Sequence, residues 1–251
     1  MSLPKTPSFR LDGRRAFVPG GSRGIGLGCA MACAEAGAHV VIAARSADQV
    51  EQAVADMRAA GHSVDGIALD VTDLTAVRAA FAEHGPFDIL VNSAGMARHG
   101  PAIDANEDDF DAVTNINIRA AYFMAQEAAK GMTNGGSIIQ ISSQMGHVGG
   151  IERSVYCGTK HAVEGFTKAM AIEWGPRQIR VNTICPTFIR TPLTAATFAD
   201  PEKVAWIESK IKVGRIGEIE DIMGAVLFLA SDASTLVTGT SILVDGGWTA
   251  G

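Results

Sequence analysis

Tyr156 and Lys160 stand four residues apart in a stretch whose apolar pattern predicts a helix over about 154–174. At that spacing the two side chains lie on one face of a helix. A tyrosine, with an ordinary pKa of about 10, exchanges protons poorly at neutral pH unless a neighbouring cation stabilises the phenolate. Lys160 is placed to be that cation, and Ser142 or Ser143 can offer a hydroxyl to the same oxygen. The group predicts proton transfer at a substrate oxygen, although the Tyr–Lys spacing alone is also typical of a surface pair.

A second set of residues predicts a phosphate cradle. Gly20, Gly24 and Gly26 form a G-x-x-x-G-x-G turn between a predicted strand (16–18) and a predicted helix (27–36). Glycines let the backbone turn sharply and approach a pyrophosphate, and the helix N-terminus supplies unpaired N–H groups. A helix-packing turn is the alternative for such a triplet. The strand–turn–helix context favours dinucleotide binding, with Asp70 at the end of the third strand available to contact adenine.

The cofactor type follows from charge at the end of the second strand. An acidic residue there would select the 2′-hydroxyl of NAD(H), but this chain has Ala44 followed by Arg45, and a second cation, Arg23, in the glycine turn. Two guanidinium groups can clamp a 2′-phosphate. We therefore expect NADP(H) to be favoured over NAD(H); the alternative is that both are solvated surface arginines.

The elements that must position these residues follow an alternating pattern. Most predicted strands are continuously apolar, as burial on both faces of a parallel sheet requires. The alternation predicts an α/β fold with one doubly wound, seven-stranded parallel sheet, helices on both faces, and a single domain over 1–251. A break at 187–214, with a helical piece near 201–212, predicts a substrate lid. The expected strands are 16–18, 38–44, 63–70, 87–92, 137–142, 179–185 and 241–245, and the expected helices are 27–36, one ending at 60, 73–83, 107–132, 154–174 and one starting near 218.

Composition excludes several classes of protein. The 251 residues are 47% hydrophobic and 19% charged, which is typical of a globular domain, and the net charge of −6 argues against nucleic-acid binding. The N-terminal residues lack the pattern of a signal peptide, and no apolar run is long enough to span a membrane. Cys29, Cys33, Cys157 and Cys185 are predicted to be reduced thiols, with no metal role expected. We expect a cytoplasmic protein.

Taken together, these motifs resemble the short-chain dehydrogenase/reductase family over nearly the whole chain, from Leu11 to Asp245. The landmarks are Gly20–Gly26, Asp70-Val71, Asn92-Ser93-Ala94-Gly95, Asn117, Ile141-Ser142-Ser143, Tyr156 with Lys160, Val181-Asn182 and Asp245-Gly246-Gly247. The family places its catalytic serine thirteen residues before the tyrosine, which selects Ser143 over Ser142. Pro19, Ser93 and Thr187 depart from the usual residues, and Pro19 is expected to weaken the bracing of the glycine turn.

The resemblance implies roles for these residues. Tyr156 would donate or accept the substrate proton, Lys160 would lower the pKa of Tyr156 and hold the nicotinamide ribose, Ser143 would hold the substrate oxygen, and Asn117 would hold a water that relays protons. The implied cofactor-binding set is Gly20, Ser22, Arg23, Gly24, Ile25, Gly26, Arg45, Asp70, Val71, Asn92, Ala94, Gly95, Ile141, Tyr156, Lys160, Pro186, Ile189 and Thr191.

The expected function is hydride transfer between nicotinamide and a small carbonyl or alcohol substrate, such as a sugar acid or polyol, with no nucleic-acid or membrane partner. The alternatives are reduction of a 3-oxoacyl group on an acyl carrier protein, for which the sequence has no clustered cations, and a nucleotide-binding sensor without turnover. A homotetramer is implied by the resemblance. The expected substrate residues are Ser143, Gln144, His147, Arg153 and Phe188, the charged ones having a solvated loop position as the alternative.

Overall fold

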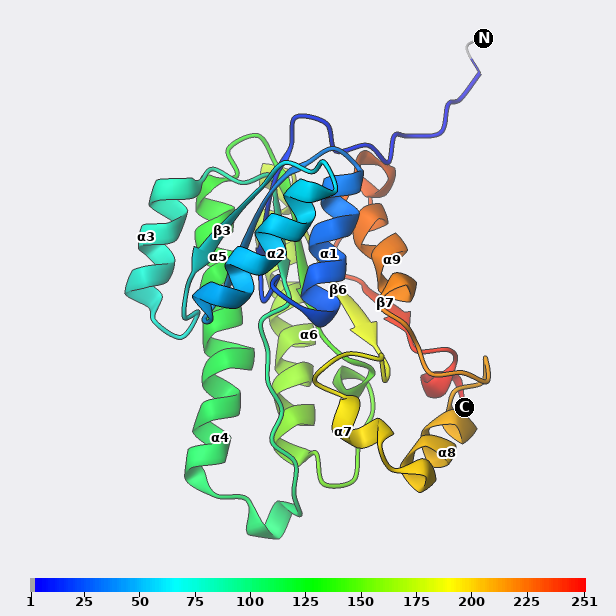
Figure 1. Ribbon diagram of the computed structural model, residues 1–251. Helices are drawn as coiled ribbons and strands as arrows, with labels where there is room; N and C mark the ends of the chain where they lie inside the picture. The colour runs from blue at the N-terminus through cyan, green and yellow to red at the C-terminus, as the bar shows by residue number, and fades with distance from the viewer. Residues whose placement is uncertain (1–2) are drawn as a thin grey trace.

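Runs of β-branched and other apolar residues form the strands of one parallel sheet (Figure 1). The computed structural model describes residues 3–251. The sheet order is β3-β2-β1-β4-β5-β6-β7, and β1 pairs with both β2 and β4, so the winding direction reverses between them. The strands are β1 (Arg15–Pro19), β2 (His39–Ala44), β3 (Val64–Ala68), β4 (Ile89–Asn92), β5 (Gly136–Ile141), β6 (Ile179–Pro186) and β7 (Ser241–Val244). The predicted fold class is confirmed.

Helices cover both faces of this sheet. The α-helices are α1 (Gly24–Glu35), α2 (Ala47–Ala59), α3 (Leu74–His84), α4 (Glu107–Thr114), α5 (Ala121–Gly131), α6 (Ser154–Trp174), α7 (Ala195–Phe198), α8 (Pro201–Lys210) and α9 (Glu220–Ala230). Helices α1, α2 and α9 bury their apolar residues on one face, and α3, α5 and α6 bury theirs on the other. Both layers are visible in Figure 1. No helix within residues 3–251 is long and apolar enough to cross a membrane.

Capping residues set where several helices begin. The Asp73 carboxylate accepts hydrogen bonds from the backbone N–H groups of Thr75 and Ala76 at the start of α3, and the Asn106 side chain accepts one from Asp109 at the start of α4. Such caps satisfy N–H groups that have no partner within the helix. These polar residues therefore fix how each helix leaves the loop before it.

Two predicted elements differ from the structure. The helix expected over 107–132 is not continuous, because a π-helical segment, Asn115–Ala120, separates α4 from α5. Hydrophobic periodicity cannot register such a segment, since one wider turn barely changes which side chains are apolar. In the 187–214 stretch, the expected helical piece is α8, which ends at Lys210, and the short helix α7 was not predicted.

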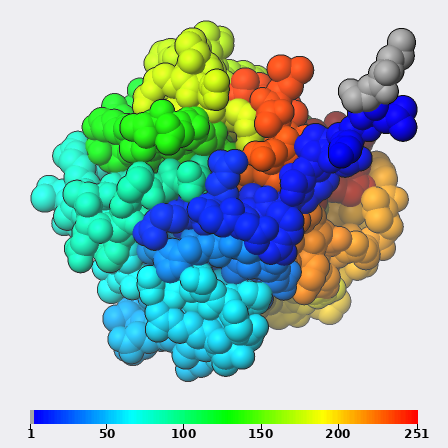
Figure 2. All heavy atoms as spheres, turned by 90° about the horizontal axis from the view of Figure 1, so that it is seen from above, coloured from blue at the N-terminus to red at the C-terminus, as the bar shows by residue number. Residues whose placement is uncertain are grey.

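The N-terminal segment packs against the C-terminal half of the chain. The Phe9 ring lies 6.5 Å from the ring of Phe228 on α9, and Arg14 forms a 3.1 Å ion pair with Asp232 just beyond that helix. Figure 2 shows the blue N-terminal segment running beside the orange residues of this region. These contacts attach the chain start to the face of the sheet that α1 and α9 cover.

In the glycine turn before α1, position 26 leaves no space for any side chain. A Cβ atom at Gly26 would overlap the backbone carbonyl of Gly20, which cannot move without breaking the turn. Gly224, on the exposed side of α9, has no atom within 4 Å of an added Cβ. The two glycines therefore form a matched pair for substitution.

We expect Gly26→Ala to lower the free energy of unfolding by about 1–3 kcal/mol, because the added methyl group must displace backbone. Gly224→Ala should raise it by about 0.5–1 kcal/mol, since alanine in a helix interior loses less conformational entropy on folding. Urea unfolding followed by circular dichroism measures both. Equal effects of the two substitutions would contradict this account of the turn.

Candidate active site

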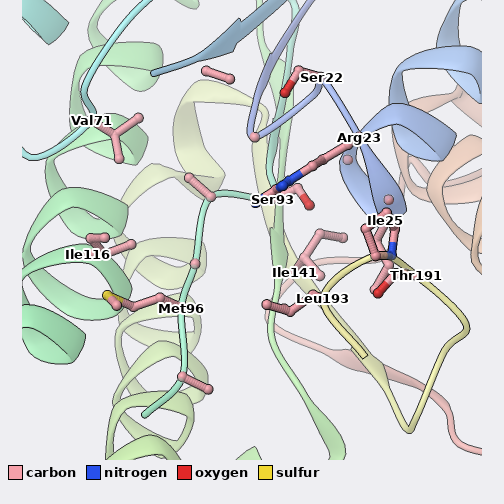
Figure 3. Close-up of a pocket in the computed structure, with 18 of the residues that line it drawn as sticks. Ser22, Arg23, Ile25, Val71, Ser93, Met96, Ile116, Ile141, Thr191 and Leu193 are labelled. Carbon is pink, nitrogen blue, oxygen red and sulfur yellow. The ribbon is translucent and has the colours of Figure 1, made fainter. Parts of the chain in front are cut away.

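A cavity of about 480 Å³ opens at the carboxyl ends of the central strands. Its lining comes from the glycine turn, the ends of β2 and β3, the loops after β4 and β5, the start of α6 and the 187–194 segment. In Figure 3, Arg23, Ile25 and Thr191 lie on one side of this space and Val71, Ile116 and Met96 on the other. The cavity lies next to β1 and β4, where the winding direction of the sheet reverses. Open α/β sheets bind ligands at such a reversal point.

The predicted phosphate cradle forms the wall of this cavity next to α1. Gly20 has a φ of +80°, and a Cβ there would lie 2.8 Å from the backbone of Ser93 and Ala94. The turn is thus pressed against the loop after β4, and Ser93 donates a 3.0 Å backbone hydrogen bond to Pro19. Pro19 keeps its carbonyl available for this contact, so the substitution noted in the sequence leaves the bracing hydrogen bond in place.

Positive charge lies at the predicted 2′-phosphate position. Arg23 and Arg45 both line the cavity, Arg23 just before α1 and Arg45 just after β2. Neither forms an ion pair within the described part of the chain. The two guanidinium groups are therefore available to an anionic ligand.

Ser143, Tyr156 and Lys160 meet at the deep end of the cavity, as expected from their spacing. The Nζ atom of Lys160 lies 5.6 Å from the centre of the Tyr156 ring and donates a 2.9 Å hydrogen bond to the carbonyl of Ile141 at the end of β5. The Ser143 hydroxyl caps the short turn after β5 by accepting a hydrogen bond from the Met145 N–H. All three side chains line the cavity.

The charge environment of Tyr156 differs from the expectation. Burial raises the pKa of Tyr156, while a hydrogen bond from Ser143 and the positive charge of Arg153 lower it, and the net shift is upward. Burial also lowers the pKa of Lys160 to about 8, partly offset by the negative charge of Glu164. Arg153 is thus a cation near the Tyr156 phenol that sequence reasoning did not identify, and the effect assigned to Lys160, whose Nζ lies 5.6 Å from the ring centre, stays a prediction.

Asn117 owes its position to the π-helical segment. Its side-chain amide accepts a 3.0 Å hydrogen bond from the Met96 N–H and donates to the Met96 carbonyl (2.9 Å) and to the Thr159 hydroxyl (3.1 Å). Asn117 therefore ties the loop after β4 to helix α6, one residue from Lys160. Asn117 does not itself line the cavity; the π segment holds this buried amide between the loop and α6, in keeping with the frequent occurrence of such segments at functional positions.

Most of the predicted cofactor residues line the cavity, and Asn92 is the exception. Its amide donates a 2.8 Å hydrogen bond to Gln140 on the neighbouring strand, and its oxygen accepts one from the Ala94 N–H. Asn92 therefore shapes the loop from behind. The residues that line the cavity as predicted are Gly20, Ser22, Arg23, Gly24, Ile25, Gly26, Arg45, Asp70, Val71, Ala94, Gly95, Ile141, Tyr156, Lys160, Pro186, Ile189 and Thr191.

Of the expected substrate residues, Ser143 alone is among the residues that line the cavity. Arg153 acts on Tyr156 by its charge and contacts Phe188, with the Arg153 guanidinium 5.3 Å from the Phe188 ring centre. Gln144 is buried and His147 points toward Glu164 and Cys185. Both follow Ser143 in a tight turn that directs their side chains behind the cavity.

Sequence reasoning missed several residues that line the cavity. Ser46 and Gln49 extend the wall beside Arg45 at the start of α2, and their position directly after the second strand was a usable signal. Met96 and Ile116 come from irregular segments that carry no recognisable pattern.

Comparison with known proteins agrees with this geometry. A family model described as enoyl-(acyl carrier protein) reductase matches residues 20–249. The chain is 37% identical to L-xylulose reductase of Bos taurus over 245 residues, covering 96% of this chain and 99% of that protein.

Solved structures show the same likeness. The gluconate 5-dehydrogenase of Burkholderia cenocepacia, crystallised with NADP and tartrate, is 36% identical with a TM-score of 0.93, covering 97% of this chain and 98% of that one. A short-chain type dehydrogenase/reductase of Mycobacterium marinum is 38% identical with a TM-score of 0.90, covering 97% and 98%. The chain belongs to the short-chain dehydrogenase/reductase family, whose members are NAD(P)-dependent oxidoreductases.

Proposed function

We propose that this protein is an NADP(H)-dependent oxidoreductase that interconverts a secondary alcohol and a ketone on a sugar acid. The observation that carries the proposal is the meeting of Ser143, Tyr156 and Lys160 at the end of a cavity whose other end holds the glycine turn and two unpaired arginines. A dinucleotide lying along that cavity would supply the hydride. The protein's own residues orient the substrate and move the proton.

In the proposed reaction, Tyr156 carries the proton. Its raised pKa keeps the phenol protonated at neutral pH, so Tyr156 can donate a proton to the oxygen of a ketone as that oxygen gains negative charge. Ser143 would hold the same oxygen by hydrogen bonding and stabilise the developing charge. In the oxidation direction Tyr156 must first lose its proton, which becomes easier as the pH rises.

Lys160 and Asn117 are proposed to support this transfer. The Lys160 ammonium is held at the Ile141 carbonyl, from which it can reach a ribose bound beside Tyr156. Asn117 holds the loop after β4 against α6. A Cβ atom at Gly95 of that loop would lie 3.3 Å from the amide oxygen of Asn117 and 3.9 Å from the ammonium of Lys160, so both groups lie on the same side of the loop. A water chain between these two groups would return a proton to Tyr156.

Arg23 and Arg45 are the proposed basis of NADP(H) selection. Both line the cavity at the end away from Tyr156, and β2 ends without a carboxylate that would select a 2′-hydroxyl. The structural relative from Burkholderia cenocepacia was crystallised with NADP. A 2′-phosphate between two guanidinium groups would gain charge-assisted hydrogen bonds that NAD(H) cannot form.

Arg153 is the proposed receptor for a substrate carboxylate. Its guanidinium is half-buried beside Tyr156, and its nearest polar partner is the Nε2 atom of His99 at 2.8 Å. Burial and the charge of Arg153 lower the pKa of His99, so the imidazole is neutral at pH 7 and accepts a hydrogen bond from the guanidinium, while Glu152 acts on Arg153 only through its charge, without a direct ion pair. Within residues 3–251 no carboxylate pairs with Arg153.

Two loops hold this arginine in place. Glu152 adopts a left-handed backbone conformation (φ 59°), and its carbonyl accepts a 3.0 Å hydrogen bond from the Gly100 N–H. This contact brings His99 beside Arg153. A strained residue next to a half-buried cation without a direct ion-pair partner is typical of a site organised for a ligand, and an anionic ligand would pair with that cation.

The 187–214 segment is proposed to act as the lid. Phe188, Ile207 and Ile211 of this segment pack with Ile216 and Trp248 in a small apolar cluster of their own, separate from the two cores of the sheet. The segment also supplies Ile189, Thr191 and Leu193 to the cavity lining. A unit that packs mainly on itself can move without disturbing the sheet.

Tyr156→Phe should lower kcat by about 10²–10⁴-fold, because the substituted ring cannot transfer a proton. The variant should still bind NADPH, as followed by nicotinamide fluorescence. A Phe variant with undiminished turnover would contradict the assignment of Tyr156. A nucleotide sensor, by contrast, would show no turnover before substitution.

Arg45→Ala and Arg23→Ala should each weaken NADPH binding by about 10–100-fold, which corresponds to the loss of charge-assisted hydrogen bonds worth about 1.5–3 kcal/mol. NADH binding should change little, because NADH lacks the 2′-phosphate. Fluorescence titration of both cofactors measures this, with Arg58→Ala, an arginine outside the cavity, as the control. Tighter binding of NADH than NADPH by the unaltered protein would refute the preference.

Arg153→Gln should lower kcat/KM for aldonates and keto-aldonates by about 10–100-fold, since a charge-assisted hydrogen bond to the carboxylate is lost. The kcat/KM for polyols and ketoses of equal chain length should stay nearly unchanged. Arg98→Gln, on the neighbouring loop after β4 and paired with Asp109, serves as the matched control. Acyl thioesters complete the panel, and equal losses on charged and neutral substrates would rule out a carboxylate receptor.

A further inference from the structure

Three side chains with metal-binding atoms converge behind the catalytic loop. His147 follows β5, Glu164 lies on α6 and Cys185 lies on β6, and one ligand atom of each lies within 4.8 Å of the others. None of the three lines the reaction cavity. Glu164 offsets part of the cost of burying the Lys160 charge, but none of the three side chains takes part in the proposed proton or hydride transfer, and that role does not account for His147.

The distances between the three ligand atoms suit a tetrahedral cation. The Cys185 sulfur lies 3.4 Å from His147 Nε2 and 3.3 Å from Glu164 Oε1, and His147 Nε2 lies 3.8 Å from Glu164 Oε2. Zinc bonds of about 2.3 Å to sulfur and about 2.0–2.2 Å to nitrogen and oxygen put tetrahedral ligands roughly 3.3–3.6 Å apart. The two Glu164 contacts involve different carboxylate oxygens, and one ligand atom from each residue lies within 4.8 Å of the others, so a rotation of that carboxylate with small side-chain shifts would bring one atom of each residue onto one ion.

The charges also suit a divalent ion. A thiolate and a carboxylate together carry two negative charges, which one divalent cation neutralises, and a neutral imidazole adds none. A buried site with no net charge avoids most of the desolvation cost of isolated ions. Without metal, burial and the charge of Glu164 together raise the pKa of Cys185 to about 12, so the thiol keeps its proton and donates a hydrogen bond to Glu164.

The surroundings contain the groups that a metal site needs. Thr183 and Ser241 donate hydrogen bonds of 2.9 and 2.5 Å to Glu164 Oε2, which fixes the carboxylate. The buried Ser142 hydroxyl has no hydrogen-bond partner yet lies close enough to Cys185 to act on its thiol. It is available to a thiolate or to a metal-bound water. The His147 side chain is 29% exposed, which gives an ion a route from solvent.

We infer that His147, Glu164 and Cys185 bind a zinc-type divalent cation, with water as the fourth ligand. Binding replaces the thiol proton: Cys185 releases H⁺ to solvent and forms a sulfur–metal bond, with no change of oxidation state. The ion would join the loop after β5 to α6 and β6, and would therefore stabilise the fold around Ser143. The mixed sulfur, nitrogen and oxygen ligands favour zinc or cobalt over calcium or magnesium.

Cobalt titration of the full-length, chelator-treated protein tests this inference. We expect a thiolate-to-cobalt charge-transfer band in the near ultraviolet that saturates at one equivalent and is displaced by zinc. Zinc, but not calcium or magnesium, should raise the Tm. Cys185→Ser should abolish the band, and His147→Gln, a change at a partly exposed side chain, should weaken cobalt binding by more than about tenfold. Cys29→Ser and His62→Gln are the matched controls and should keep both effects.

Several results would overturn the inference. A band that survives in both Cys185→Ser and His147→Gln would place the metal elsewhere, and so would its loss in Cys29→Ser. An unchanged Tm with zinc would show that the three side chains form only a hydrogen-bonded cluster. Because the readouts are absorption and thermal stability, they do not depend on the oxidoreductase activity or on the identity of its substrate.

Discussion

The buried ammonium of Lys160 is the constraint on which the rest of the site depends. Burial opposes its charge, as the lowered pKa shows, and the Ile141 carbonyl together with the negative charge of Glu164 offsets part of that cost. The carbonyl belongs to β5 and Glu164 to α6, and Thr183 of β6 donates a hydrogen bond to Glu164. The ammonium therefore requires these elements to dock in one register, and that register also places Tyr156, one helical turn before Lys160, at the cavity.

The wall of the cavity opposite Lys160 depends on close contact between two backbone segments, the glycine turn and the loop after β4. Gly20 lies against the loop after β4, and Asn117 holds the same loop against α6 through Met96 and Thr159. The loop is thereby fixed between the predicted cofactor cradle and the catalytic helix. A single irregular feature, the π-helical segment that carries Asn117, thus links the two halves of the site.

Features that repeat in sequence were predictable, and features that depend on one irregular turn were not. The continuous apolar runs predicted all seven strands, and the boundaries of α6 agree residue for residue. The π segment left no trace in the hydrophobic pattern. The turn after Ser143 sends Gln144 and His147 away from the cavity, and nothing in residue type distinguishes such a turn from an open loop. The cluster of His147 with Glu164 and Cys185 was invisible for the same reason, since three separate elements supply it.

Arg153 joins substrate recognition to the proton chemistry. Its charge is one of the two influences that lower the pKa of Tyr156, and burial outweighs both. A substrate carboxylate bound to the guanidinium would cancel much of that charge, so the phenol would hold its proton more tightly until the substrate oxygen needs it. In the oxidation direction the positive charge of an oxidised nicotinamide would act in the opposite sense and favour the phenolate. The protonation state of Tyr156 would therefore follow from which of these proposed ligands is bound, because Arg153 already acts on the phenol by its charge.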